Sequence, residues 1–86
     1  MTTKTSAVRL NTVKRGHWLR IQSIPEGEIR AQFVRLGIHE GTRVRLIERL
    51  PGGTVVLGKR RQELAIGHIL ARQISVLVLH GEEQTP

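Results

Sequence analysis

The chain has no cysteine, which excludes a disulfide framework and any thiolate metal site. It is also poor in aromatic residues, with one Trp, one Phe and no Tyr among 86 residues. The core therefore has to be assembled from aliphatic side chains, and Val and Ile among them favour strands. A chain of this length has room for one small core. These shortages together predict a single, mainly β domain.

Long apolar runs are absent as well. No stretch approaches the roughly 20 apolar residues that cross a bilayer as a helix, and the polar N-terminal segment lacks the apolar core of a secretory signal. We therefore expect a soluble, cytoplasmic protein.

Acidic residues are scarce too, since the chain has 14 Lys and Arg but only seven Glu and no Asp, which gives a net charge of +7. Such a charge favours nucleic acid, an anionic membrane or an acidic protein surface as partner.

The residue types that carry catalysis are largely missing. Between Val8 and His80 there are five Glu but no Asp, Cys or Tyr, which leaves few candidates for a nucleophile or an acid–base pair. Gly52-Gly53 lacks the Lys-Ser/Thr continuation of a phosphate-binding loop and falls between predicted strands. The scarcity of catalytic residue types and the lack of a phosphate-binding loop predict a protein that is not an enzyme and holds no cofactor.

The four histidines do not have the spacing of a metal site. No two of them stand at i and i+4, and His39 beside Glu40 offers only two ligands. We interpret them as ordinary surface histidines and predict no metal site. They are His17, His39, His68 and His80.

The periodicity of apolar residues defines one domain over residues 8–80, with polar tails at 1–7 and 81–86. Alternation of apolar and polar side chains, with Ile47 out of register and indicating a bulge, predicts about five short antiparallel strands. Their predicted ranges are Trp18–Ile24, Arg43–Leu50, Thr54–Gly58, Gln62–Ile66 and Gln73–Leu79. Strands this short and numerous favour a closed or nearly closed small barrel.

One short helix interrupts the strands. Ile29, Phe33 and Leu36 recur at spacings of four and three, which places them on one helical stripe, and Gly37 follows as a left-handed stop. Gly41 turns the chain into the next strand, and Gly67 to Ala71 is predicted to form a tight helical turn. The segment Pro51-Gly52-Gly53 is the clearest hairpin signal in the chain.

Several ordered motifs between Arg30 and Val76 resemble the FeoA family, ferrous iron transport protein A. They are Arg35-Leu36-Gly37-Ile38, Glu40-Gly41-Thr42, Leu50-Pro51-Gly52-Gly53, Leu64-Ala65-Ile66, and Ala71 followed by Ile74-Ser75-Val76. Two features depart from the family pattern: His39 stands where Pro is more common, and Lys59-Arg60-Arg61 adds a basic triplet to a hairpin. The resemblance implies an SH3-like barrel that works with FeoB, a membrane transporter with a cytosolic guanine-nucleotide-binding domain.

The candidate partner-binding residues lie on the outward side of the predicted strands. Arg43 and Arg45 alternate with Val44 and Leu46, and the basic triplet belongs to the neighbouring hairpin. The full set is Trp18, Arg20, Arg43, Arg45, Lys59, Arg60 and Arg61.

Alternatives remain open at this stage. Trp18 is either an exposed interface anchor or a cap on one end of the barrel. The basic residues suit an acidic protein surface, nucleic acid or simple solvation, although nucleic-acid-binding barrels usually carry more aromatic residues than this chain has. A third possibility is a free-standing relative of the SH3-like domain found in some metal-dependent repressors.

Overall fold

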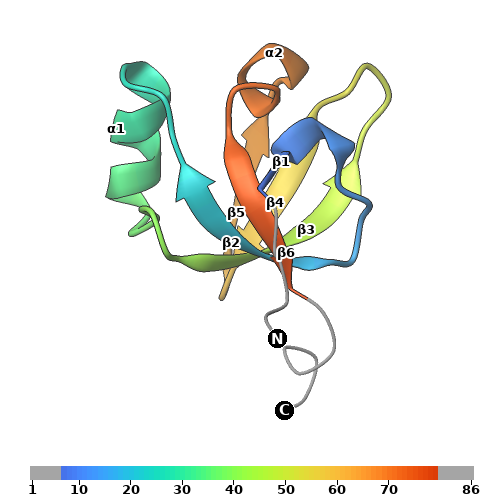
Figure 1. Cartoon of the computed structure of the whole chain (residues 1–86), viewed down its shortest axis with the longest axis horizontal. Helices are drawn as coiled ribbons and strands as arrows, with labels where there is room; N and C mark the ends of the chain where they lie inside the picture. Colours follow the sequence, from blue (N-terminus) through green and yellow to red (C-terminus); the bar gives the residue numbers. More distant parts are fainter. Residues whose placement is uncertain (1–6, 80–86) are drawn as a thin grey trace, which may run out of the picture.

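The computed structural model describes residues 7–79, which form one strongly curved antiparallel sheet with short helices at its rim (Figure 1). Apart from Ala7, the predicted tails lie outside the described residues, as does His80. The strands are β1 (Val8–Arg9), β2 (Trp18–Ser23), β3 (Arg43–Arg49), β4 (Val55–Lys59), β5 (Gln62–Ile66) and β6 (Ser75–Leu79). The helices are η1 (Leu10–Thr12, a 3₁₀ turn), α1 (Glu28–Arg35) and α2 (His68–Ala71).

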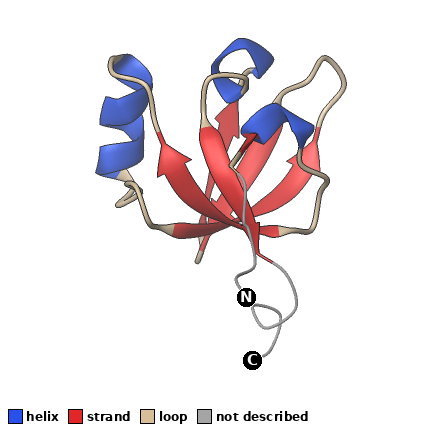
Figure 2. Ribbon diagram, in the orientation of Figure 1, coloured by secondary structure: helices blue, strands red, loops and turns tan. Residues whose placement is uncertain are grey.

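The sheet has the strand order β1-β6-β2-β3-β4-β5, with every neighbouring pair antiparallel. The mainly β fold, the five predicted strands and the one substantial helix are confirmed. The strand number needs one correction, because the two-residue strand β1 adds a sixth strand by pairing with β6. Two residues are too few to show alternation, so nothing local in the sequence marks β1 as a strand. Figure 2 shows how the strands curl around a common interior.

Alternation along the strands sends one set of aliphatic side chains into that interior. Leu19 and Ile21 of β2, and Val44 and Leu46 of β3, are each no more than 1% exposed. The register between β3 and β4 shifts between Leu46 and Glu48, which confirms the predicted irregularity at Ile47. This bulge places the Ile47 side chain over Gly58, where a Cβ would stand 2.4 Å from Ile47 Cδ1. Gly58 is therefore the residue that lets the bulged side chain lie against the sheet.

Helix α1 closes one side of the interior. Phe33 is fully buried and Ile29 nearly so, while Leu36 is half-buried against the same cluster. The helix ends in a Schellman motif: the Gly37 N–H donates to Val34 O at 2.9 Å, and the Ile38 N–H donates to Phe33 O at 2.8 Å. Gly37 has the left-handed φ of +76° that this motif requires. Ile38 and Phe33, the two residues joined by the longer hydrogen-bonded loop of the motif, are both buried. The helix stop predicted at Gly37 is confirmed.

The turn between β3 and β4 lies against α2. Gly52 and Gly53 both have positive φ, and the Gly53 N–H donates to Leu50 O at 3.0 Å across Pro51. A Cβ on Gly53 would stand 2.7 Å from the Cβ of His68, so a side chain at this position would collide with α2. Gly41 also has positive φ, and its N–H donates to Ile21 O at 2.8 Å where the chain enters β3. These glycines are backbone requirements of the fold.

Candidate binding surface

The outward faces of β2 and β3 carry an aromatic residue among arginines. Cα pairing sets Trp18 opposite Arg45 and Arg20 opposite Arg43, while Leu19 and Val44 between them face the interior. The Arg43 guanidinium carbon lies 4.8 Å from the centroid of the Trp18 ring, which is a cation–π contact.

Trp18 is half-buried and is not among the side chains of the hydrophobic core or those packed against it. The structure therefore places it on the outer surface of the sheet, where it is available to an interface.

The β4–β5 hairpin brings the basic triplet next to these arginines. Lys59 pairs with Gln62, so Arg60 and Arg61 form a two-residue turn. Strand β4 pairs directly with β3, with Gly58 opposite Arg45, which explains why residues distant in sequence share one surface.

Two grooves flank this hairpin. The first, here called the Trp18 groove, has a volume of about 420 Å³ and is lined by Trp18, Thr42, Arg43, Lys59 and Arg60. The second, here called the Arg35 groove, has a volume of about 650 Å³ and includes Arg35, Gly37 and the whole triplet. Lys59 and Arg60 line both grooves, whereas Arg43 lines only the first and Arg61 only the second. Arg20 lies outside both linings and donates from Nη1 to Gly41 O at 3.0 Å, and Arg45 also lies outside both.

Sequence reasoning missed Arg35 and Thr42, which come from the end of α1 and from the corner before β3. It did not anticipate the position of Lys59 either: a Cβ on Gly37 would stand 3.4 Å from Lys59 Nζ. The ammonium group therefore lies beside the C-terminal end of α1, where a positive charge is favourable. No local pattern reveals these contacts, since each joins segments that are distant in the chain.

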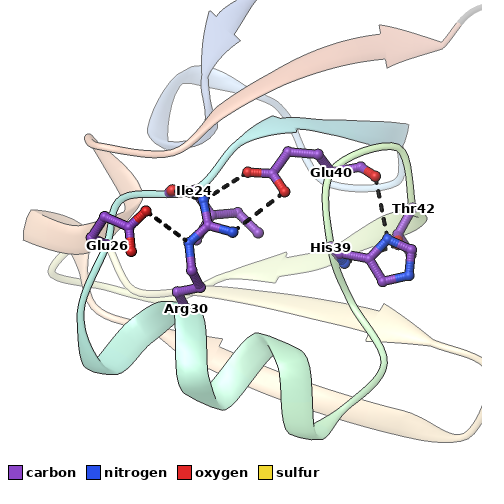
Figure 3. A network of polar contacts seen from close by, with 6 residues as sticks. All are labelled: Ile24, Glu26, Arg30, His39, Glu40 and Thr42. Atoms are coloured by element: carbon purple, nitrogen blue, oxygen red, sulfur yellow. Dashed lines mark hydrogen bonds and ion pairs between the residues drawn. The ribbon is translucent and has the colours of Figure 1, made fainter.

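A second polar network lies away from the grooves and fixes the corner around α1 (Figure 3). Arg30 Nη2 donates to Glu40 Oε2 at 2.8 Å and to the backbone oxygen of Ile24 at 2.6 Å, and Arg30 Nε lies 3.8 Å from Glu26 Oε2. The hydrogen bond from Arg30 holds the pKa of the Glu40 carboxyl below its usual range, and the same bond raises the pKa of Arg30. Arg30 thus ties the start of α1 to the turn before β3.

This network predicts an acid-sensitive contribution to stability. Because the pKa of Glu40 is lower in the folded protein than in the unfolded chain, its ionised form stabilises the fold above the unfolded pKa. That contribution disappears as pH falls through the folded pKa. We expect Glu40→Gln to lower the melting temperature at neutral pH, and we expect this deficit to shrink as pH falls below the ordinary glutamate pKa of about 4.3.

Glu63→Gln is the matched control, because Glu63 is exposed on β5 and forms no ion pair with the described residues. Thermal unfolding followed by circular dichroism across this pH range measures the difference. A Glu40→Gln deficit that does not change with pH would contradict the assigned role of the carboxylate.

The described histidines belong to three different segments: His17 precedes β2, His39 precedes β3, and His68 begins α2. Across residues 7–79 no three side chains of His, Cys, Asp or Glu gather in a way that could hold a metal ion. The polar contacts of His39 are with neighbours in the chain, since its Nδ1 lies 3.3 Å from Glu40 O and its backbone N–H donates to the Thr42 hydroxyl at 3.0 Å. His39 therefore shapes the turn that leads into β3 (Figure 3).

The fold and this surface define a small, basic, SH3-like β-barrel domain. The family model described as the FeoA domain matches residues 8–78. The chain belongs to the FeoA domain family, which is linked to ferrous iron transport and consists of small accessory domains. None of the helices formed by residues 7–79 is long and apolar enough to cross a membrane.

Solved structures support the same fold. One is the crystal structure of an iron uptake regulatory protein, FeoA, with a TM-score of 0.72 and 24% identity over 86% of this chain and 99% of that one. Another is the NMR structure of a FeoA-like protein from Clostridium acetobutylicum, with a TM-score of 0.72 and 28% identity over 91% of this chain and 93% of that one. A search of curated proteins found no match.

Proposed function

We propose that this chain is a non-enzymatic accessory protein of ferrous iron uptake, which binds the cytosolic part of a FeoB-like, GTP-dependent iron transporter and modulates it in the cytoplasm. The observation that carries the proposal is the FeoA domain match over residues 8–78, nearly the whole described chain. A nucleotide would belong to the partner, because Gly52-Gly53 joins two strands and does not precede a helix that could receive a phosphate.

The surface around Trp18 supports a role in binding. Trp and Arg are the residue types most enriched where protein interfaces concentrate their binding energy, and here they lie in direct contact on the outer face of the sheet. Arg43 and Arg45 are both exposed, so they are suited to attract an acidic surface before contact is made. We assign the transporter contact to the surface formed by Trp18, Arg20, Arg43, Arg45 and the Lys59–Arg61 hairpin, here called the basic strip.

A titration of the purified chain against the cytosolic GTP-binding domain of its own organism's FeoB-like transporter tests the proposal. We expect saturable binding by calorimetry and a changed rate of GTP hydrolysis by the transporter domain. The salt dependence should be moderate, because an interface that includes apolar contacts weakens less with salt than binding to phosphates does. If a nucleotide-competent transporter domain shows no binding even at low salt, the accessory role is wrong.

A further inference from the structure

The Trp18 groove gathers three cationic side chains from three places in the chain. Arg43 comes from the start of β3, Lys59 from the end of β4 and Arg60 from the hairpin turn. The remaining lining residues are Trp18 and Thr42, so the groove contains a hydroxyl donor and no carboxylate. Three cationic side chains that share one lining without a carboxylate make the local potential positive, and a positive potential favours an anionic ligand.

Within residues 7–79, no acidic side chain neutralises Lys59 or Arg60 of the hairpin. Arg30 forms ion pairs with Glu26 and Glu40, but it lies near the start of α1, at the opposite end of that helix from Lys59. Lys59 and Arg60 form no ion pair with any described residue. The Lys59 ammonium lies beside Gly37 at the end of α1, and it has no acidic partner among residues 7–79, so its N–H donors can serve a ligand.

The fold restrains the charged group of one of the three cations and the backbone of another. The Arg43 guanidinium lies over the Trp18 ring at 4.8 Å, which restricts the rotamers of a long side chain. Arg60 has φ of +60° in a two-residue turn, a position where Gly, Asn or Asp is usual and where an arginine stores backbone strain. The restraint on Arg43 reduces the side-chain entropy that is lost when a ligand binds.

From these observations we infer that the Trp18 groove binds a phosphate group. A phosphate carries up to two negative charges and three acceptor oxygens, which matches three cations and a hydroxyl better than a single carboxylate does. The guanidinium forks of Arg43 and Arg60 suit phosphate geometry, and the volume of about 420 Å³ lies in the range of small-ligand sites. The phosphate is carried by a soluble small molecule or by a lipid headgroup.

An extended nucleic acid strand fits this surface less well. Strand-binding barrels stack successive bases on several aromatic rings. Here Trp18 is the only aromatic residue outside the core, its ring already contacts Arg43, and Phe33 is fully buried. The site therefore offers strong anion recognition with little capacity for base stacking.

This inference goes beyond the proposed function, and its test needs only the isolated protein. Trp18 is the only tryptophan in a chain without tyrosine, so intrinsic fluorescence reports on the groove directly. We expect pyrophosphate, the soluble probe, to change this fluorescence saturably at constant ionic strength, whereas matched sulfate and chloride controls change it much less.

Substitutions separate a ligand site from a structural role. Arg60→Gln should raise the Kd for pyrophosphate about tenfold, and Lys59→Gln combined with Arg60→Gln about a hundredfold. Arg72→Gln is the control, because Arg72 is exposed at the end of α2 and its replacement removes the same single positive charge as Arg60→Gln. Arg60→Gly should weaken binding while raising the melting temperature, since glycine relieves the strained φ. A merely structural role for Arg60 does not produce that combination.

A comparison of pyrophosphate with phospholipid vesicles identifies the source of the phosphate. A response to pyrophosphate alone points to a soluble ligand, and a blue shift only with phosphatidylglycerol vesicles, absent with phosphatidylcholine, points to a headgroup. The inference is overturned if neither probe gives a saturable response, or if sulfate and chloride reproduce the pyrophosphate signal. A response confined to single-stranded oligonucleotides, with the steep salt dependence of multiple phosphate contacts, would also overturn it.

Discussion

Replacement of Phe33 with alanine is expected to remove most of the domain's free energy of unfolding, so that the variant unfolds at a much lower urea concentration than the parent protein. Phe33 is fully buried within the same cluster as Val44, Leu46 and Val76. Truncation of a buried phenylalanine costs about 3–5 kcal/mol. A small domain has a total stability of only about 5–15 kcal/mol, and one with this little surface to bury lies near the lower end.

Val34→Ala is the matched control, because Val34 is the next residue of α1 and is 60% exposed. It should change stability by no more than about 0.5 kcal/mol. Urea denaturation followed by Trp18 fluorescence and far-ultraviolet circular dichroism measures both variants, since Trp18 lies outside the truncated site. If Phe33→Ala unfolds at the same urea concentration as Val34→Ala, then α1 is not an integral part of the core.

The fold was largely predictable because its determinants are local. Alternation in β2 and β3 identifies the buried faces, and the Ile29–Phe33 spacing followed by Gly37 identifies α1 and its end. The bulge at Ile47 could also be read from a break in alternation. By contrast, β1 exists only through its pairing with β6, more than 60 residues away in the chain, and two residues have no periodicity of their own.

The binding surface was predictable as a set of residues but not as a shape. The alternation of Arg43 with Val44 indicates an outward side chain, yet nothing in the sequence places its guanidinium on the Trp18 ring 25 residues earlier. The Arg30–Glu40 contact was missed for a similar reason, since it crosses a turn whose geometry depends on the packing of α1. Its only local sign is the i, i+4 spacing of Glu26 and Arg30.

Charge reversal on β3 should have a large effect on binding with little effect on folding. Arg43 and Arg45 are both exposed and form no part of the core. If the basic strip meets an acidic surface on the transporter's cytosolic domain, then Arg43→Glu combined with Arg45→Glu turns attraction into repulsion. We expect association at low salt to slow about tenfold or more, because exposed interfacial charges act mainly on the rate of encounter. Each single reversal should have a smaller effect.

The control for this double reversal has to carry the same change of net charge elsewhere on the molecule. Arg9→Glu combined with Arg72→Glu meets that requirement, because both residues are exposed, on β1 and at the end of α2. Stopped-flow association with the transporter domain, repeated over a range of salt concentrations and alongside a single-stranded oligonucleotide, separates local contact from overall charge.

A slower rate in both double variants would mean that only the net charge of +7 matters. Loss of oligonucleotide binding alone would indicate a nucleic acid partner. If the Arg43 and Arg45 double reversal binds the transporter domain as fast as the parent at low salt, the basic strip is a solvated face. The interface then has to lie elsewhere, and the Pro51–Gly53 turn, with exposed Leu50 and Ile69 beside it, is the next surface to mutate.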